Sequence, residues 1–383
     1  MPVAFTFAVV DLTGSASTLG LVLTAGFVSR IALLLLGGVV ADRLRRQRVM
    51  LGADILRALT QGLVAALLLA GVARVWELVV LFALYGAGEA FFGPASTRLV
   101  AEAAPPERLQ QANAWMSASP SVAFAVGPAL AGMLVAGIGP WIVFALDAGT
   151  FAVSATTLAL LRLPAGRPAP ATAGVVDDLR AGWGELRTRT WVWASIAYFS
   201  ISNLALAPVY VLGPFVAERE LGGPTAWGLI VTCGGVGSLL GDVIAMRVKP
   251  RRSLLPGYLL LAGWALLPAL LARPFPVAAL APAAALGFGA LSFSNALWLT
   301  AIQERIPRDA LSRVSAYDWL GSRIFQPLGY ALAGPAGAAI GVPATLLVGA
   351  AVHASASVAV ALVPDVRRLR RREALTREIV IRR

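Results

Sequence analysis

Ionisable side chains lie inside long apolar stretches of this 383-residue chain, and these are the residues that could do chemistry. Charge in such surroundings is rare and costly, so it usually faces a cavity or a partner. Glu89 stands near the middle of the apolar run 76–101, where a carboxyl group can bind and release a proton. Arg30 stands at mid-depth in the run 19–40 and could hold Glu89 in an ion pair. The two roles are compatible, because breaking such a pair can control proton release.

Two further pairs of charges lie nearer the ends of apolar runs. Asp54 and Arg57 are three residues apart in the run 49–70, so one helix face can hold them as a structural ion pair. Asp318 and Arg323 are five residues apart, a poor spacing within one helix, and each is expected to find a partner on another helix. Asp318 lies close to the end of its run, whereas Arg323 lies deeper and could face a cavity.

Three other reactive residues point to less specific roles. Asp147 lies two turns into the run 141–162, where a gating role and a packing role are both open. His353 lies in a run of small residues, where packing is favoured over proton relay. With one histidine and one cysteine, Cys233, the chain lacks the clusters that catalytic and metal sites need, so neither an enzyme nor a metal is expected. It also lacks the phosphate-binding loop of ATP-hydrolysing proteins.

The apolar runs that carry these residues have the length of membrane spans. A run of 22 residues is roughly 33 Å long as a helix, enough to cross the hydrocarbon core of a bilayer. Because the chain is 58% hydrophobic and only 14% charged, we predict an all-α polytopic membrane protein. Residues 1–10 are apolar but too short to cross, so we expect the chain to be truncated within its first helix, which has half length. The full spans are predicted at 19–40, 49–70, 76–101, 111–137, 141–162, 189–217, 226–246, 254–272, 275–301, 312–339 and 343–363.

Basic residues indicate how the spans are oriented. The net charge is +12, from 32 basic and 20 acidic residues. Most of the basic residues fall in loops or tails of one side, whereas Arg74, Arg219 and Arg273 fall on the other. This asymmetry is typical of the positive-inside rule, so it predicts a cytoplasmic C-terminus and argues against a nucleic-acid partner.

The two halves of the chain repeat. Residues 20–28 align with 228–236, and residues 127–132 align with 329–334 at nearly the same offset. Parallel repeats of this kind build transporters in which the substrate site lies between two helical bundles. We therefore predict four parts: an N-terminal bundle at 1–162, a linker with an amphipathic helix at 163–188, a C-terminal bundle at 189–363 and a basic tail at 364–383.

A polar loop between the first two full spans carries an acid among several arginines. Arginines alone would orient the spans, so the acid indicates a second role. Gly38, Asp42, Arg43 and Arg46 match the signature Gly-x-x-x-Asp-Arg-x-Gly-Arg between helices 2 and 3 of the major facilitator superfamily, which the loop resembles. Arg45 stands where that family usually has glycine.

The resemblance implies a gate latch at this loop. Asp42 would lie near the inner end of helix 11, the predicted span 312–339, where backbone N–H groups can hold a carboxylate. The loop arginines would pair with acids at neighbouring helix ends, and these contacts would break when the inner side opens. Asp54, Arg57 and Asp318 are included in this predicted latch because they lie close to the same side.

The span 111–137, which is helix 5 when the half-length first segment is counted as helix 1, carries a second motif. Gly127, Pro128, Ala131 and Gly132 look like a weakened form of the antiporter motif Gly-Pro-x-x-Gly-Gly of exporters in this superfamily, although small residues also serve close helix packing. The arginine-centred helix 4 motif of many drug:proton antiporters is absent. Other strings resemble bacterial drug:proton antiporters grouped with the enterobactin and macrolide exporters, namely residues 11–17, 41–44, 91–95, 106–114 and 317–322.

The resemblance implies a major facilitator fold of two pseudo-symmetric six-helix bundles and export driven by proton influx. Glu89, Arg30, Arg323 and Asp147 are then the candidates for proton coupling or for the substrate cavity. The expected partners are protons, lipid and a small amphipathic substrate, such as a drug or a siderophore-like metabolite. We expect a monomer in the bacterial inner membrane that uses the proton gradient and no cofactor. A metabolite importer of the same fold and a non-transporting truncated protein stay open as alternatives.

Overall fold

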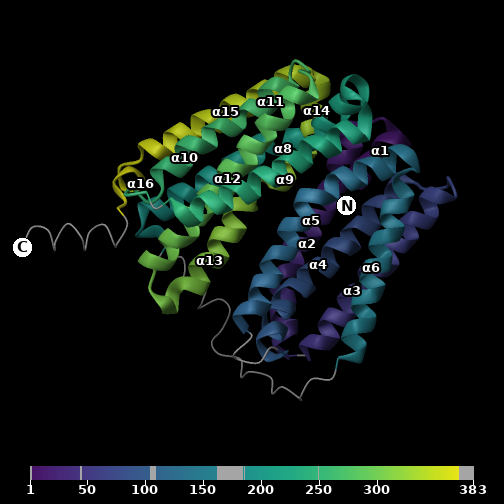
Figure 1. Ribbon diagram of the computed structural model, residues 1–383, viewed down its shortest axis with the longest axis horizontal. Coiled ribbons are helices and arrows are strands. Elements are labelled where there is room, and N and C mark those ends of the chain that lie inside the picture. The colour runs from purple at the N-terminus through teal and green to yellow at the C-terminus, as the bar shows by residue number, and fades with distance from the viewer. Residues whose placement is uncertain are drawn as a thin grey trace, which may run out of the picture. The chain divides into compact units, whose positions relative to one another are not determined.

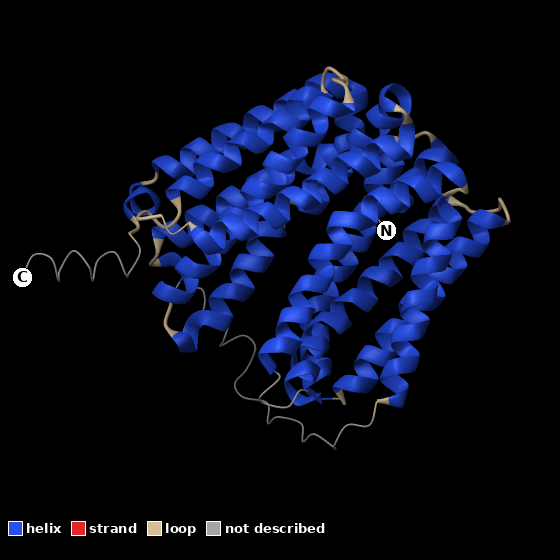
Figure 2. Ribbon diagram, in the orientation of Figure 1, coloured by secondary structure: helices blue, strands red, loops and turns tan. Residues whose placement is uncertain are grey.

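A computed structural model describes residues 2–43, 45–103, 109–161, 184, 186–248 and 250–370. Within these ranges the regular structure is helical (Figures 1 and 2), apart from an isolated bridge between Arg252 and Arg370. The chain divides into two compact units. Unit 1 comprises residues 1–172, 217–228 and 330–335, and unit 2 comprises residues 173–216, 229–329 and 336–383.

Unit 1 is built mainly from the helices that correspond to the predicted half-helix and the first five full spans. They are α1 (Pro2–Thr13), α2 (Ala16–Arg43), α3 (Arg46–Leu69), α4 (Val75–Ala103), α5 (Leu109–Gly137) and α6 (Pro140–Leu160). Helix α4 packs along α2 and α3, and α3 also packs along α6. These four helices position the charged residues that the first half of the sequence carries within its spans.

Unit 2 contains the helices that correspond to the later spans. They are α8 (Thr190–Val216), most of α9 (Gly223–Arg247), α10 (Leu255–Leu261), α11 (Leu266–Leu271), α12 (Val277–Arg305), α13 (Arg308–Arg323), most of α14 (Gln326–Ile340), α15 (Val342–Leu362) and α16 (Pro364–Arg368). Helix α15 packs against α8, α10 and α11. A short turn, η2 (Ala217–Leu221), precedes α9 and belongs to unit 1.

Two of the predicted spans are interrupted, and a proline accounts for each interruption. In the span 254–272, the 3-10 turn η3 (Ala262–Ala265) separates α10 from α11, just before Pro268. In the span 312–339, α13 ends at Arg323 and α14 begins at Gln326, just before Pro327. Proline has no N–H to donate to the carbonyl four residues earlier, and its ring crowds that carbonyl.

The break between α13 and α14 leaves carbonyl groups that α8 satisfies. The hydroxyl of Ser200 donates a hydrogen bond to the carbonyl of Gly321. The amide of Asn203 donates to the carbonyl of Ser322 at 2.8 Å. An unpaired carbonyl is costly where water is scarce, so these two polar residues of an otherwise apolar helix stabilise the interruption.

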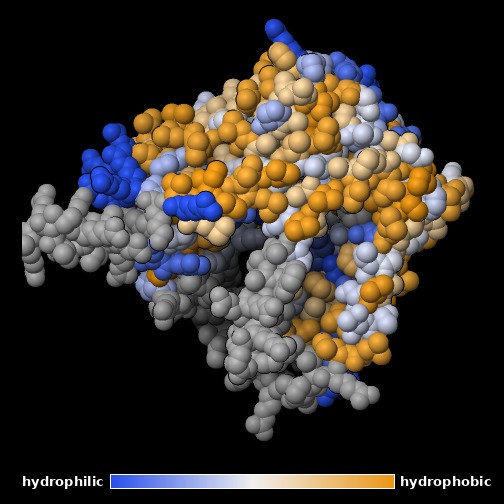
Figure 3. Space-filling view, viewed as in Figure 1, coloured by the Kyte–Doolittle hydropathy of each residue, from blue (hydrophilic) through white to orange (hydrophobic). Residues whose placement is uncertain are grey.

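The described helices suit a membrane. Among them, nine are long and apolar enough to cross one by length and composition, and Val3–Thr13 and Leu255–Leu271 form shorter apolar segments. Large apolar side chains are exposed along their outer faces, including Leu59, Val153 and Leu160 at 67%, 68% and 75%. Figure 3 shows hydrophobic residues over much of the visible surface. The predicted amphipathic helix of the linker lies largely outside the described residues, as does the tail beyond 370.

Candidate functional site

Helices α2 and α4 touch through two glycines. A Cβ atom on Gly86 would lie 2.3 Å from the carbonyl oxygen of Gly26, a distance that real side chains do not reach. The ring of Phe82 also lies against Gly26, where a Cβ atom would meet it at 2.3 Å. Only glycine at these positions lets the two backbones come so close. The residues one turn further along each helix are therefore brought face to face.

Those residues are Arg30 and Glu89, which form an ion pair. The guanidinium Nη1 of Arg30 lies 3.1 Å from Oε2 of Glu89. The two side chains are 38% and 32% exposed, so the pair is neither sealed in the core nor fully open. The carboxylate of Glu89 is thus held by a cation and still accessible.

A second ion pair is buried one helix away. The guanidinium of Arg57 contacts Asp54 on the same helix, and the two side chains are only 8% and 1% exposed. The guanidinium carbon lies 4.2 Å and 4.4 Å from the ring centres of Phe92 and Phe151, within the range of cation–π attraction. The hydroxyl of Ser154 on α6 donates to Asp54 Oδ2 at 2.6 Å. This pair links α3 to α4 and α6, which favours the predicted structural role.

Gly88 makes room for the buried arginine. A Cβ atom there would lie 2.8 Å from Cγ of Arg57. The sequence around Glu89 therefore serves two contacts at once, with Gly86 toward α2 and Gly88 toward α3. Helix α4 is the element that brings both ion pairs together.

Asp147 is held by an amide. The side chain of Gln61, which is 2% exposed, donates from Nε2 to Asp147 Oδ2 at 2.9 Å. Within the described part of the chain, no lysine or arginine forms an ion pair with Asp147. Tyr85, four residues before Glu89, packs edge-on against Phe151 with ring centres 6.1 Å apart, and the same Phe151 ring lies under the guanidinium of Arg57. These groups form one cluster inside unit 1, here called the polar layer: Arg30, Asp54, Arg57, Gln61, Tyr85, Glu89, Asp147 and Ser154.

Several members of the polar layer were not predicted from the sequence. Gln61 lies seven residues after Asp54 on α3, and Ser154 lies seven residues after Asp147 on α6. Since seven residues are two helical turns, each pair shares one helix face. The antiparallel contacts Gln61–Asp147 and Asp54–Ser154 match this spacing. The repeated interval was therefore a signal available in the sequence.

Unit 2 holds Asp318 and Arg323 on α13. The indole Nε1 of Trp298 on α12 donates to Asp318 Oδ2 at 2.9 Å, so the acid has a partner on another helix. The hydroxyl of Ser322 donates to Asp318 Oδ1 at 3.2 Å. The guanidinium of Arg323 lies 5.4 Å from the ring centre of Trp319, on its own helix. The spacing of five residues keeps the two charges from pairing directly.

His353 belongs to a buried hydrogen-bond network in unit 2. Its Nε2 lies 2.8 Å from the carbonyl oxygen of Leu261, and its Nδ1 lies 2.8 Å from the hydroxyl of Ser202. Because a carbonyl only accepts, Nε2 carries the proton. Leu261 is the last residue of α10, directly before the 3-10 turn η3 that interrupts the span 254–272. The histidine thus stabilises an interrupted helix, in keeping with a packing role.

The predicted latch loop lies partly outside the described residues. Gly38, Asp42 and Arg43 fall in the last turns of α2, and Arg46 begins α3, but their side chains are not among those described. The latch contacts therefore stay a prediction. Gln47, for which no role was predicted, donates from Nε2 to the carbonyls of Leu158 and Leu161 at 2.5 and 2.7 Å. It caps the C-terminal end of α6 and fixes the loop to that helix.

The helix 5 motif makes a close backbone contact within unit 1. A Cβ atom on Gly132 would lie 2.5 Å from the carbonyl oxygen of Pro224, and one on Gly228 would lie 2.5 Å from that of Pro128. Ala131 is buried, whereas nothing lies within 4 Å of a Cβ atom on Gly127. Three of these small residues therefore serve helix packing, and their role as an antiporter motif stays a prediction.

A metal centre is not formed by the described residues, among which no group of His, Cys, Asp or Glu could hold an ion. The charged groups of the polar layer form ion pairs and hydrogen bonds inside an apolar helix bundle. Charged groups of this kind inside apolar spans are typical of transporters.

Comparison with known proteins also indicates a transporter. The multidrug efflux pump Tap of Mycolicibacterium fortuitum is 29% identical over 364 residues, covering 90% of this chain and 87% of the pump. Macrolide efflux protein A of Streptococcus pyogenes is 22% identical over 225 residues, covering 58% of this chain and 56% of that protein.

Solved structures show the same fold. The nucleoside transporter NupG superposes with a TM-score of 0.69 at 14% identity, covering 93% of each chain. A bacterial homologue of the human lysosomal transporter Spinster, inward-facing and occupied, has a TM-score of 0.63 at 17% identity, covering 96% of this chain and 92% of that one. The predicted major facilitator fold is confirmed. A family profile for the Major Facilitator Superfamily matches residues 1–325. The chain therefore belongs to the Major Facilitator Superfamily and is a multi-pass membrane transporter, not an enzyme.

Proposed function

We propose that this transporter exports amphipathic small molecules in exchange for protons. The observation that carries the proposal is the accessible ion pair of Arg30 and Glu89, at 3.1 Å within an apolar helix bundle. The multidrug and macrolide efflux named for its relatives supports export of drug-like cargo, and a siderophore-like metabolite is a second candidate. The proton gradient is the energy source, so no cofactor is required.

The polar layer supplies the groups that such an exchange needs. A proton that binds the carboxylate of Glu89 cancels its charge and removes the attraction that holds Arg30. A freed arginine and a neutral acid change which partners each can contact, and loss of the proton restores the pair. Asp147 lies in the same layer with an amide as its hydrogen-bond partner, so it is a second carboxyl group that can take part.

The buried pair of Asp54 and Arg57 has a different part in this proposal. Its side chains are almost fully enclosed and tie α3 to α4 and α6. It holds the layer in register while Glu89 and Asp147 exchange protons. The chain acts as a monomer in the bacterial plasma membrane with its C-terminus in the cytoplasm, and the Asp42 loop latches the inner side.

Dye uptake into inverted membrane vesicles tests the proposal. With an acidic interior, the wild type should accumulate the lipophilic cation ethidium, and an uncoupler should abolish the uptake. Glu89→Gln should lose most of the uptake, because the amide cannot exchange a proton. The matched control is Glu220→Gln, which removes an exposed carboxylate outside the polar layer and should leave the uptake unchanged. Uptake that ignores the pH gradient would refute proton coupling.

A further inference from the structure

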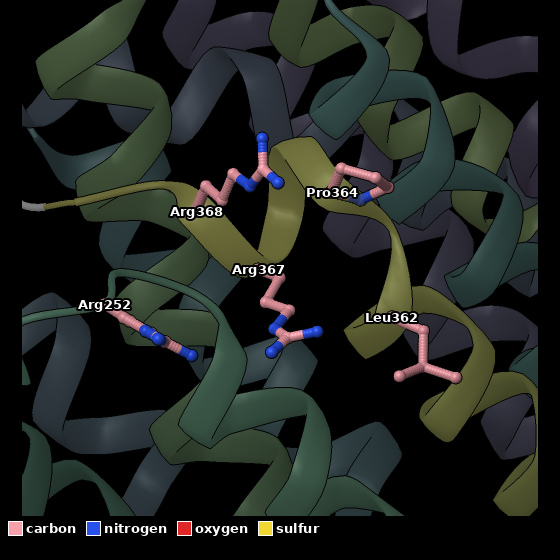
Figure 4. Close-up of a pocket in the computed structure, with 5 residues that line it drawn as sticks. All are labelled: Arg252, Leu362, Pro364, Arg367 and Arg368. Carbon is pink, nitrogen blue, oxygen red and sulfur yellow. The ribbon is translucent and has the colours of Figure 1, made fainter.

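A pocket of about 240 Å³ lies where α15 ends in unit 2. It is lined by Arg252, Leu362, Pro364, Arg367 and Arg368 (Figure 4). Two of its arginines come from the short helix α16, and the third comes from the segment between α9 and α10. We propose that this pocket binds the phosphate group of an anionic phospholipid. The proposal concerns a surface unrelated to the polar layer and does not depend on the direction of transport.

The fold holds these arginines together. Val366 of α16 is completely buried and anchors that helix. The backbone N–H of Ser253 donates to the carbonyl of Leu369 at 2.8 Å, next to the bridge between Arg252 and Arg370. The chain after α15 is therefore attached to the segment that carries Arg252. This backbone pairing places Arg252 beside α16, so that arginines of both segments line one pocket. In Figure 4 the side chains of Arg252 and Arg367 lie on one side of α16, and that of Arg368 extends to the other.

A second contact reinforces the same attachment. The guanidinium of Arg305, at the end of α12, donates to the carbonyl of Arg370. Three separate segments, from α12, from the connection before α10 and from the chain after α15, thus meet beside the pocket. These contacts hold the segments that carry the pocket arginines next to one another.

The charge of the pocket favours an anion. Arg252, Arg367 and Arg368 are all exposed, and within the described residues none of them forms an ion pair. Like charges gathered around one hollow repel each other unless an anion compensates them. Guanidinium groups bind phosphate through paired hydrogen bonds, which makes arginine the side chain best suited to this ligand.

The position of the pocket favours a lipid over a soluble anion. Leu362 is the last residue of the membrane span α15 and is 63% exposed. Pro364 is exposed beside it. An apolar wall that continues a span, with arginines directly beyond it, matches the boundary between acyl chains and headgroups. A soluble phosphate would make no use of that apolar wall.

Lipid binding by the full chain in neutral detergent tests the proposal. Native mass spectrometry and thermal unfolding would be measured with phosphatidylglycerol and, for comparison, with zwitterionic phosphatidylcholine. The test variant combines Arg252→Gln, Arg367→Gln and Arg368→Gln. The control variant removes the same charge from exposed arginines that do not line the pocket, namely Arg187, Arg247 and Arg251, each replaced by Gln.

The wild type should bind one phosphatidylglycerol in preference to phosphatidylcholine. Each arginine near an anionic headgroup strengthens binding roughly five-fold, so the test variant should bind about 100-fold more weakly. The control variant should bind within about five-fold of the wild type. Equal weakening of both variants would refute the pocket and indicate general attraction of charge.

Two further measurements distinguish a lipid site from a site for a soluble anion and from unspecific lipid adhesion. Glycerol 3-phosphate, which carries the phosphate without acyl chains, should not stabilise the wild type at the same concentration. Stabilisation equal to that by phosphatidylglycerol would contradict the lipid assignment and indicate a site for a soluble anion. The second measurement needs only the wild type. Phosphatidylglycerol is titrated onto it, and binding should saturate at one tightly held lipid per chain. Binding without saturation or headgroup preference would overturn the proposal even if the test variant failed to fold.

Discussion

Replacement of Gly86 by alanine tests whether the contact between α2 and α4 creates the ion pair of the polar layer. The new Cβ atom would start 2.3 Å from the carbonyl oxygen of Gly26 and 3.4 Å from its Cα atom. Ordinary contacts of a Cβ atom begin near 3.4 Å, so the two helices must move apart by about 1 Å. The neighbour is backbone, which cannot rotate out of the way.

The separation weakens the ion pair as well as the packing. A displacement of about 1 Å would lengthen the Arg30–Glu89 distance from 3.1 Å to the limit of an ion pair, about 4 Å. Overpacking of this kind costs about 1–3 kcal/mol of stability. We therefore expect Gly86→Ala to lower the unfolding temperature in detergent and to reduce ethidium uptake per molecule of transporter.

The matched control is Gly93→Ala on the same helix. Nothing lies within 4 Å of a Cβ atom at Gly93, so the substitution should be neutral or slightly stabilising. The assay is a double-mutant cycle for the free energy of unfolding, with Arg30→Gln and Glu89→Gln in both alanine backgrounds. The pair should couple by about 1 kcal/mol in the Gly93→Ala background and by much less in the Gly86→Ala background. Equal coupling in both backgrounds would refute the reasoning.

Three further predictions concern residues that hold the helices in place. Arg57→Leu should cost about 3–5 kcal/mol of stability, because it leaves the buried carboxylate of Asp54 unpaired, and Asp54→Asn in the same chain should recover part of that loss in thermal unfolding. Gln47→Leu should cost about 1–2 kcal/mol, since two carbonyls at the end of α6 lose their donor, and hydrogen exchange should rise there but not in α3. His353→Leu should destabilise the chain by about 2–4 kcal/mol but keep the wild-type pH profile of transport, because the histidine packs in unit 2. A shifted profile would contradict that role.

The helices were predictable from the sequence because apolar runs of membrane length leave few alternatives. Their interruptions were not. Proline lies inside α8 at Pro208 and Pro214 without breaking it, whereas Pro327 lies in the first turn of α14, directly after the break that follows α13. The difference lies in what surrounds each proline, since Ser200 and Asn203 donate hydrogen bonds to the carbonyls of Gly321 and Ser322 at this break. Such contacts join residues more than a hundred positions apart, and local sequence carries no record of them.

The polar layer shows the same limit. Matching depths in two spans indicated that Arg30 could meet Glu89, and the three-residue spacing indicated the pair of Asp54 and Arg57. The contact of Gln61 with Asp147 depends on the register between α3 and α6; the shared seven-residue interval fits that register but does not by itself select it from others. The glycines of α4 were visible, but which helix each one would contact was not.

The most direct test of proton-coupled export is the flow of protons driven by a substrate gradient alone. The purified chain would be reconstituted into liposomes that contain ethidium and a pH-sensitive dye, with equal pH on both sides. Exchange predicts that outward movement of ethidium acidifies the interior of wild-type liposomes, and that Glu89→Gln abolishes this acidification while Glu220→Gln does not. Outward ethidium movement in the wild type with no change of internal pH would contradict the central claim.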